Sequence, residues 1–284
     1  MLDNDIVDFY ESQLETYDEL NSHFEIYYRE FGNWIKKHLD KKRSNVADMG
    51  CGTGTLSKIL TELGHTVYGI DVSGKLIKVA ATKSKENFLF LRGDISNLPI
   101  RESSIDNAIC FGVLDQVDEI EKVIDEAWRI LKPGGRFLFD ISPFPTLDFW
   151  YFLGLYGKSG FSSAVRGIYE SKIQFSWSIR GDDGKSKLIN IYRYKPSHIE
   201  RMIQKKGFKT IGRRGFHISK MFIPEKIHVD GRSKVLLKID NACWRLDDYL
   251  NRFNVLQENA LYLMYACMKM RTNAKYESVN QLLF

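Results

Sequence analysis

The stretch Val46-Ala-Asp-Met-Gly-Cys-Gly-Thr-Gly54 sets the architecture expected for the whole chain. Three glycines, Gly50, Gly52 and Gly54, stand at alternate positions between an apolar run and an amphipathic run. Because glycine has no Cβ, the backbone there can turn tightly and approach a ligand closely. The N–H groups at the start of the following helix can then face a carboxylate or a phosphate. The pattern therefore predicts a strand, a ligand-binding loop and a helix in succession.

The residues after the glycines continue this pattern. Apolar side chains recur three and four residues apart, which indicates one buried face of a helix: Leu56, Ile59, Leu60 and Leu63. The run Thr66-Val-Tyr-Gly-Ile70 predicts a second buried strand, with Asp71 at its carboxyl end. An acidic residue about 20 positions past the first glycine is placed to bind ribose hydroxyls. Taken alone, Asp71 equally fits a helix cap, since Asp71-Val-Ser73 precedes the next predicted helix.

The glycine loop differs from the dinucleotide fingerprint G-x-G-x-x-G, because Thr55 stands where the third glycine is needed. The form G-x-G-x-G, with Asp48 two residues ahead, resembles the first motif of class I S-adenosylmethionine-dependent methyltransferases. Three further stretches resemble later motifs of that family, in the same order: Arg92-Gly-Asp-Ile-Ser-Asn-Leu-Pro99, Asp106-Asn-Ala-Ile-Cys-Phe-Gly-Val-Leu114 and Leu131-Lys-Pro-Gly-Gly-Arg-Phe-Leu-Phe-Asp140. The resemblance covers roughly residues 45 to 141 and continues more weakly to 270.

The resemblance implies an α/β fold with a Rossmann-like, mostly parallel sheet of seven strands. It also implies helices on both faces and a last strand that runs antiparallel between its two neighbours. Strand-like and helix-like runs alternate from 45 to 140, as in a parallel sheet covered on both faces. The alternation stops after Ile141, where an inserted α+β cap rich in aromatic residues begins. Within this cap, residues 173–179 and 188–194 alternate apolar and polar side chains around Asp182-Asp183-Gly184, which predicts a hairpin.

These patterns divide the chain into four parts. They are an N-terminal helical lid (1–43), the cofactor-binding core (44–141), an inserted substrate cap (142–195) and a C-terminal completion of the sheet (196–284). In the lid, we expect helices over 5–20 and 22–39. In the last part, a helix opened by Pro196-Ser197 ends at Gly207. A further amphipathic helix is expected over 239–253, before an apolar strand at 260–268.

The resemblance implies S-adenosyl-L-methionine as the cofactor and assigns parts of it to the matching residues. It places Gly50, Cys51 and Gly52 around the methionine portion, Asp71 on the ribose, and Val72, Asp94 and Ile95 on the adenine, with Gly54 also among the cofactor-binding residues. The carbonyl of Phe111 meets the methionine amino group. Asp48 either orients the loop or meets that amino group through water.

Methyl transfer from a sulfonium is an in-line displacement that depends on alignment, with reacting atoms roughly 3 Å apart. It requires no metal ion, and we expect none. Asp115 follows the fourth strand, where a carboxylate can remove a proton or orient an amine; it equally fits a cap of the helix near Asp118. Tyr10 and Tyr17 precede the glycine loop, as do lid tyrosines of small-molecule methyltransferases, but they also fit a helix core. We take Asp115 and Tyr17 as catalytic candidates, and Tyr10, Tyr17 and Trp150 as acceptor-binding candidates.

Composition limits the class of protein. The 284 residues are 44% hydrophobic and 27% charged, which fits a globular protein. The net charge of +5 permits an anionic partner without demanding one. The N-terminus lacks an apolar signal core and the apolar runs are too short to span a membrane. Four cysteines without metal-ligand spacing fit reduced thiols, so we expect a cytoplasmic protein away from membranes. The sequence does not determine the oligomeric state.

A small-molecule acceptor is the first hypothesis, and two alternatives remain. One is an RNA methyltransferase, because a basic cluster follows the cap: Arg201, Lys205, Lys206, Lys209, Arg213, Arg214 and Lys220. This cluster spans a helix and a strand whose side chains do not share one face, so no nucleic-acid partner is expected. The other alternative is a non-catalytic protein of the same fold that binds an adenosine ligand.

Overall fold

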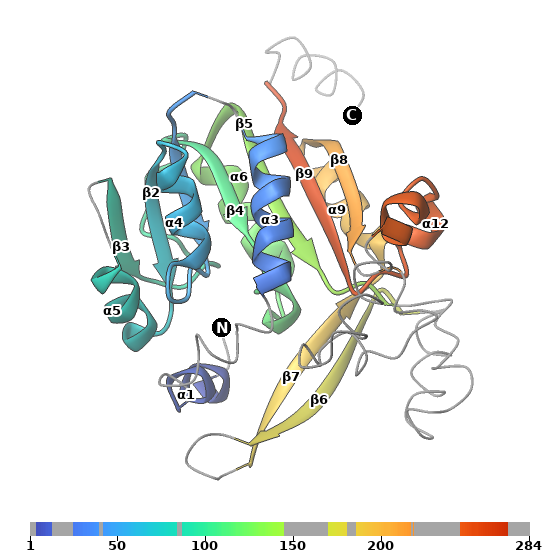
Figure 1. Ribbon diagram of the computed structural model, residues 1–284, viewed down its shortest axis with the longest axis horizontal. Helices are drawn as coiled ribbons and strands as arrows, with labels where there is room; N and C mark the ends of the chain where they lie inside the picture. Colours follow the sequence, from blue (N-terminus) through green and yellow to red (C-terminus); the bar gives the residue numbers. More distant parts are fainter. Residues whose placement is uncertain are drawn as a thin grey trace, which may run out of the picture.

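A seven-stranded sheet forms the centre of the computed structural model, with strand order β3-β2-β1-β4-β5-β9-β8 (Figure 1). The structure describes residues 4–12, 25–39, 42–83, 87–144, 170–180, 186–216, 218 and 245–271. The strands of the sheet are β1 (Asn45–Met49), β2 (Thr66–Asp71), β3 (Phe88–Arg92), β4 (Ile105–Cys110), β5 (Leu131–Ile141), β8 (Phe208–Phe216) and β9 (Tyr262–Lys269). The first five pair in parallel, and β9 runs antiparallel between β5 and β8. The predicted Rossmann-like sheet, with its antiparallel last strand, is therefore confirmed.

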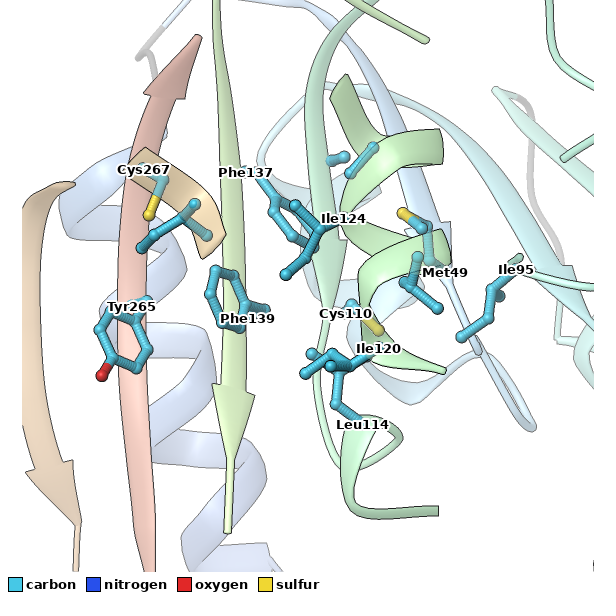
Figure 2. Packing of buried hydrophobic residues seen from close by; sticks show 14 of the residues in the cluster. Met49, Ile95, Cys110, Leu114, Ile120, Ile124, Phe137, Phe139, Tyr265 and Cys267 are labelled. Carbon is cyan, nitrogen blue, oxygen red and sulfur yellow. The ribbon is translucent and has the colours of Figure 1, made fainter. Parts of the chain in front are cut away.

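Helices cover both faces of the sheet, as predicted (Figure 1). One face carries α3 (Glu25–His38) and α4 (Thr55–Glu62), and the other carries α6 (Ile120–Ile130) and α9 (Pro196–Lys206). Because successive strand residues point to opposite faces, each strand contributes to two cores. Phe137 and Phe139 of β5 join the core beside α6, whereas Leu138 joins the core beside α3. Figure 2 shows the first of these cores, in which residues from β1, β4, β5 and β9 pack against α6.

A separate hairpin follows β5 in the chain. Strands β6 (Lys172–Arg180) and β7 (Ser186–Tyr194) pair antiparallel, which confirms the predicted pairing. The predicted turn at Asp182-Asp183-Gly184 lies outside the described residues. The Tyr194 N–H donates to the Ser142 carbonyl at 3.0 Å, and the Phe144 N–H donates to the Tyr194 carbonyl at 3.1 Å. These bonds fix the base of the hairpin to the end of β5, and the hairpin extends beyond the sheet edge toward which β5 points (Figure 1). The rest of the predicted cap, at 145–169, lies outside the described residues.

Helix α1 (Asn4–Ser12) lies beyond the same edge and contacts β7 (Figure 1). Phe9 packs on Ile189 of β7, and both side chains are buried. On the other side of α1, the Ser73 Oγ donates to a Glu11 carboxylate oxygen at 3.0 Å. The helix therefore links the hairpin to the end of β2, although the two elements are far apart in sequence.

Helix boundaries differ from the prediction in the C-terminal part. The helix that begins at Pro196 ends as predicted, with Gly207 in the left-handed conformation at φ 99°. The helix expected over 239–253 is helical at 245–250 and ends before Asn251 among the described residues. The amide of Asn251 bonds both the N–H and the carbonyl of Gly215 at 2.8 and 2.9 Å, so tertiary contacts end this helix. The short helix α12 (Asn254–Gln257) follows.

The remaining described elements are α5 (Gly74–Thr82) and a 3₁₀ turn, η2 (Leu114–Gln116). Over the described ranges, no helix has the length and apolar content that crossing a membrane requires.

Candidate active site at the carboxyl edge of the sheet

The glycine loop is built from left-handed backbone. Gly50, Gly52 and Gly54 have φ values of 80°, 53° and 81°, a region that side chains with a Cβ rarely adopt. The N–H groups of Gly50 and Cys51 donate to the Ile70 carbonyl at 2.7 and 3.0 Å. A Cβ added at Gly50 would lie 2.4 Å from Val113. Glycine is therefore required for this loop to lie between β2 and the segment after β4.

Helix α4 begins at this loop without a side-chain cap. Its N-cap residue is Gly54, which has no side chain to accept a bond from the first turn. The first N–H groups of a helix have no partner within the helix and carry partial positive charge. The start of α4 can therefore meet an anionic group, as the sequence predicted.

Asp71 holds the glycine loop from the end of β2. Its carboxylate accepts from the Gly52 N–H and from the Ser73 N–H, each at 2.9 Å, and the residue is 9% exposed. The cap of α5 is Ser73, whose Oγ accepts from the Leu76 N–H at 3.2 Å. Burial raises the pKa of Asp71, although these amide bonds oppose the shift. Asp71 is thus a buried loop anchor, and its oxygens can each accept a further bond.

Asp48, two residues before the first glycine, is also buried. The Ser57 Oγ of α4 donates to its carboxylate at 2.5 Å. Burial raises the pKa of Asp48 to about 7, and the charge of Asp71 adds to the shift. Of the two roles that the resemblance offered, the geometry accounts for orientation of the loop through Ser57.

The segment after β4 carries a carboxylate that the sequence analysis did not select. The Gly112 N–H donates to Asp140 Oδ1 at 2.8 Å, and burial raises the pKa of Asp140 to about 8. Asp140 lies near the carboxyl end of β5 and is 2% exposed. A signal was present, because an acidic residue directly after the apolar run Phe137-Leu-Phe is costly to bury without a role.

Asp115 lies in the turn η2, between the end of β4 and α6. Its Oδ2 accepts from the Ser142 Oγ at 3.3 Å, and its Oδ1 is buried with no hydrogen-bond partner among the described residues. Burial raises the pKa of Asp115, and the positive charge of Arg193 opposes the shift. The N-cap of α6 is Glu119, so Asp115 does not cap that helix.

Tyr10 of α1 reaches the same region. The Gln116 amide donates to its hydroxyl at 2.5 Å. Burial raises the pKa of Tyr10, and the charges of Asp115 and Asp71 add to the shift. Tyr10 therefore lies within electrostatic reach of the ends of both β2 and β4. Tyr17 and Trp150 lie outside the described residues.

The other predicted residues lie along the same edge, but their side chains differ in direction. The ring of Phe111 stacks on Phe31 of α3 at 4.8 Å and belongs to the core on that face. Ile95 is buried in the opposite core. Asp94 Oδ1 accepts from the Ser96 N–H at 2.8 Å, which stabilises the turn after β3. The Val72 carbonyl accepts from Arg92 Nε at 3.0 Å, and Cys51 is 8% exposed.

Four carboxylates thus gather at this edge with raised pKa values: Asp48, Asp71, Asp115 and Asp140. None of the four forms a salt bridge with another described residue. Buried carboxylates without a cationic partner favour a ligand that brings positive charge. A sulfonium with an adjacent ammonium group has that chemistry.

Comparison with known proteins agrees with this site. Residues 47–139 match the family model described as a methyltransferase domain. The protein YqeM of Bacillus subtilis is 34% identical over 138 residues, which are 46% of this chain and 55% of YqeM. A demethylmenaquinone methyltransferase of Listeria welshimeri is 29% identical over 201 residues, which are 63% of this chain and 81% of that enzyme.

A solved structure shows the same fold at low sequence identity. An S-adenosylmethionine-dependent methyltransferase of Methanosarcina mazei superposes with a TM-score of 0.54 at 18% identity. The superposition covers 83% of this chain and 96% of that one. Residues 47–139 are therefore a methyltransferase domain, and the chain has the fold of S-adenosylmethionine-dependent methyltransferases, for which S-adenosylmethionine is the cofactor. The chain spans about half the length of YqeM.

Proposed function

We propose that the protein transfers the methyl group of S-adenosylmethionine to a small organic acceptor by in-line displacement. The observation that carries this proposal is the meeting of α1 with the hairpin beyond the carboxyl edge of the sheet. Phe9 packs on Ile189, and Tyr10 accepts a hydrogen bond from Gln116. An acceptor held under such a cover is kept from water, where alignment is best enforced.

In this proposal each part of the site has a role. S-adenosylmethionine, when bound, supplies an electrophilic methyl group on a positively charged sulfur. Asp71 binds the ribose, while its amide bond to Gly52 keeps the glycine loop in shape. The backbone of the loop and the Phe111 carbonyl hold the methionine portion, and Val72, Asp94 and Ile95 hold the adenine. Asp115 receives the proton of the acceptor, and Tyr10 lies beside the acceptor. The roles of Tyr17 and Trp150 in acceptor binding stay predictions.

The four parts of the chain that the sequence predicts each have a role in the proposed function. Residues 1–43 act as a lid and 142–195 as a substrate cap on the core at 44–141, with 196–284 completing the sheet. The contact between Phe9 and Ile189 supports the first two assignments, because it joins lid and cap directly. The name of the Listeria relative, a demethylmenaquinone methyltransferase, also supports a small-molecule acceptor.

The alternative of RNA methylation finds little support in the basic cluster. Lys206 pairs with Asp125 at 2.5 Å, and Arg213 pairs with Glu200 at 2.5 Å. Lys209 of β8 lies opposite Met268 of β9, and Met268 lies opposite Arg136 of β5. Arg136 is in the half of β5 that is farther from the site, so Lys209 is also far from it. Lys206 and Arg213 are thus paired with acidic residues, and the cations near the start of β8 lie at the opposite edge of the sheet. Lys220 lies outside the described residues.

Reduced cysteines support a cytoplasmic location for this enzyme. Cys51, Cys110 and Cys267 are buried free thiols, and such thiols persist in a reducing compartment.

The proposal is tested by removing the first 20 residues, which include α1. Formation of S-adenosylhomocysteine is measured by mass spectrometry against a library of small acceptors and against total RNA. We expect turnover of the small acceptors to fall more than tenfold, while thermal unfolding shifts by only a few degrees. The matched control is Val255→Ala, which removes an exposed side chain of α12.

Two results would contradict the proposal. The first is normal turnover by the truncated protein. The second is activity on RNA that decreases steeply with salt, as phosphate contacts require. Tight binding of S-adenosylhomocysteine with no turnover of any acceptor would favour the non-catalytic alternative.

A further inference from the structure

The buried Oδ1 atom of Asp115 has no hydrogen-bond partner among the described residues. A carboxylate oxygen loses its water on burial, and leaving it without a donor is costly. Such an atom is therefore strained, or it is completed by a water molecule, an ion or a ligand. At the edge of the sheet that holds the cofactor loop, a ligand is the direct explanation.

We infer that the acceptor presents an N–H or O–H group to Asp115 Oδ1. The inference rests on the proposed function and adds the chemical class of its substrate.

The neighbouring donors are already engaged. The Ser142 hydroxyl has one proton, which it directs to Asp115 Oδ2 at 3.3 Å. The Gln116 amide donates to the Tyr10 hydroxyl at 2.5 Å, and the Gly112 N–H donates to Asp140 at 2.8 Å. The Ser142, Gln116 and Gly112 donors are thus directed to other atoms, and none of them completes Oδ1.

The path of the chain brings Asp115 next to the cofactor loop. Val113 lies against Gly50, since a Cβ at that glycine would meet it at 2.4 Å. Asp115 follows Val113 by two residues, in the same turn. Between them and β4, the position of Gly112 is open on its Cβ side: no described atom lies within 4 Å. An acceptor near Gly112 would thus have the cofactor loop on one side and Asp115 on the other.

The chemistry of this arrangement balances. Where this N–H or O–H group is the one methylated, the electron pair of its nitrogen or oxygen forms the new bond to the methyl carbon. Asp115 takes the proton from that atom as the methyl group leaves the sulfonium, whose sulfur keeps the bonding pair. The proton then passes to solvent. A nucleophilic carbon without an N–H or O–H partner would leave Oδ1 uncompleted.

The mostly negative charges around Asp115 favour a ligand that donates a hydrogen bond. Asp140 and Asp71 add negative charge near Asp115 and Tyr10, and Arg193 of the hairpin opposes it from one side. Arg193 also lies 5.5 Å from the ring of Phe175, so it has a second contact on the hairpin.

The experiment compares small probes that differ only in the proton-bearing group. Aniline and phenol, both uncharged at pH 7, are titrated against N,N-dimethylaniline and anisole, using the full chain saturated with S-adenosylhomocysteine and ligand-observed NMR. We expect aniline, phenol or both to bind at least tenfold more tightly than their proton-free counterparts. In Asp115→Asn this preference should fall below twofold, because an amide that donates from one atom no longer matches a donor ligand.

The matched control is Asp118→Asn, since Asp118 lies in the same segment and bonds Lys172. This variant should keep the preference, and both variants should bind S-adenosylhomocysteine within twofold of the wild type. Equal binding of all four probes, or an unchanged preference in Asp115→Asn, would overturn the inference. If S-adenosylhomocysteine itself does not bind the wild type, the proposed function fails, and the inference fails with it.

Discussion

Charged residues at the two edges of the sheet have different kinds of partner. At the amino edge, Lys132 pairs with Asp106 at 2.6 Å and Arg129 pairs with Glu126 at 2.7 Å. Lys269 donates to the carbonyls of Trp128 and Leu131, each at 2.7 Å. At the carboxyl edge, buried Asp residues accept from amides and hydroxyls and have no ion pair among the described residues.

The different pairing of charges at the two edges distinguishes the candidate active site better than the presence of a cavity does. A cavity of about 460 Å³ lies at the amino edge, beside Trp128, Lys206 and Lys269. Lys206 pairs there with Asp125, and Lys269 donates to backbone carbonyls, so this cavity offers little to a ligand. The buried carboxylates at the carboxyl edge form no ion pair with another described residue, and a cationic ligand there would lower the free energy of the folded state.

The largest expected effect comes from a side chain in the glycine loop. Gly52→Val should abolish binding of S-adenosylmethionine, at least 100-fold in Kd, because the β-branched side chain occupies space that the loop leaves for the ligand and strains a φ of 53°. Isothermal titration calorimetry measures the affinity, and circular dichroism checks the fold.

The matched control for this variant is Gly134→Val at the amino edge. Gly134 is also left-handed, at φ 86°, and no described atom lies within 4 Å of its Cβ position. This variant should be destabilised to a similar extent, by about 1–2 kcal/mol, yet bind the ligand normally. Loss of binding in both variants would show that the edges do not differ.

The next effect concerns the acid at the end of β2. Asp71→Ala should weaken S-adenosylmethionine binding by about 1.5–3 kcal/mol, roughly 10- to 150-fold, because a hydrogen-bonded charge is lost. Asp106→Ala is the control at the other edge, where the carboxylate accepts from the Asn45 N–H and Lys132. Calorimetry should find its affinity unchanged, and equal losses would contradict the comparison.

The pH dependence of stability sharpens the comparison further. Asp48 and Asp140 have folded pKa values of about 7 and about 8, well above those of an unfolded chain. Their contribution to stability is therefore complete below about pH 4 and is lost as pH rises through 7 to 8. The unliganded protein should therefore lose unfolding free energy as the pH rises from 5 to 8.5.

Urea unfolding at several pH values measures this slope. Asp140→Asn keeps an acceptor for the Gly112 N–H but has no charge to bury, so its slope should be shallower. A cationic ligand favours the ionised carboxylates, so binding of S-adenosylmethionine should release protons and tighten between pH 5.5 and 7.5. A steeper slope in Asp140→Asn would contradict this assignment.

The smallest effect is expected far from the site. Lys206→Ala and Lys209→Ala, alone or together, should change turnover of a small acceptor by less than twofold. Raising salt from 50 to 300 mM should also have little effect, because no row of phosphates is being bound. A steady-state assay is sufficient, and a strong salt dependence that disappears in the double variant would favour RNA.

Local patterns in the sequence were sufficient for most of the fold. The alternate glycines after Val46 predicted the turn, because only left-handed backbone fits there and glycine adopts it freely. Gly207 predicted the end of α9 for the same reason. Ordered motifs then implied the strand order, including the antiparallel β9. The helix expected to reach Phe253 ends earlier because Asn251 bonds the distant Gly215, which no local pattern contains.

For the site, the sequence by itself determined which acids and glycines follow each strand, because parallel strands bring their carboxyl ends to one edge. Only the tertiary structure decided how those residues are used. In the folded chain, the ring of Phe111 stacks on Phe31 of α3, Asp48 accepts a hydrogen bond from Ser57, and Asp140 accepts one from Gly112. One oxygen of Asp115 has no hydrogen-bond partner among the described residues. Burial and long-range hydrogen bonds set those roles, and both depend on residues far apart in the chain.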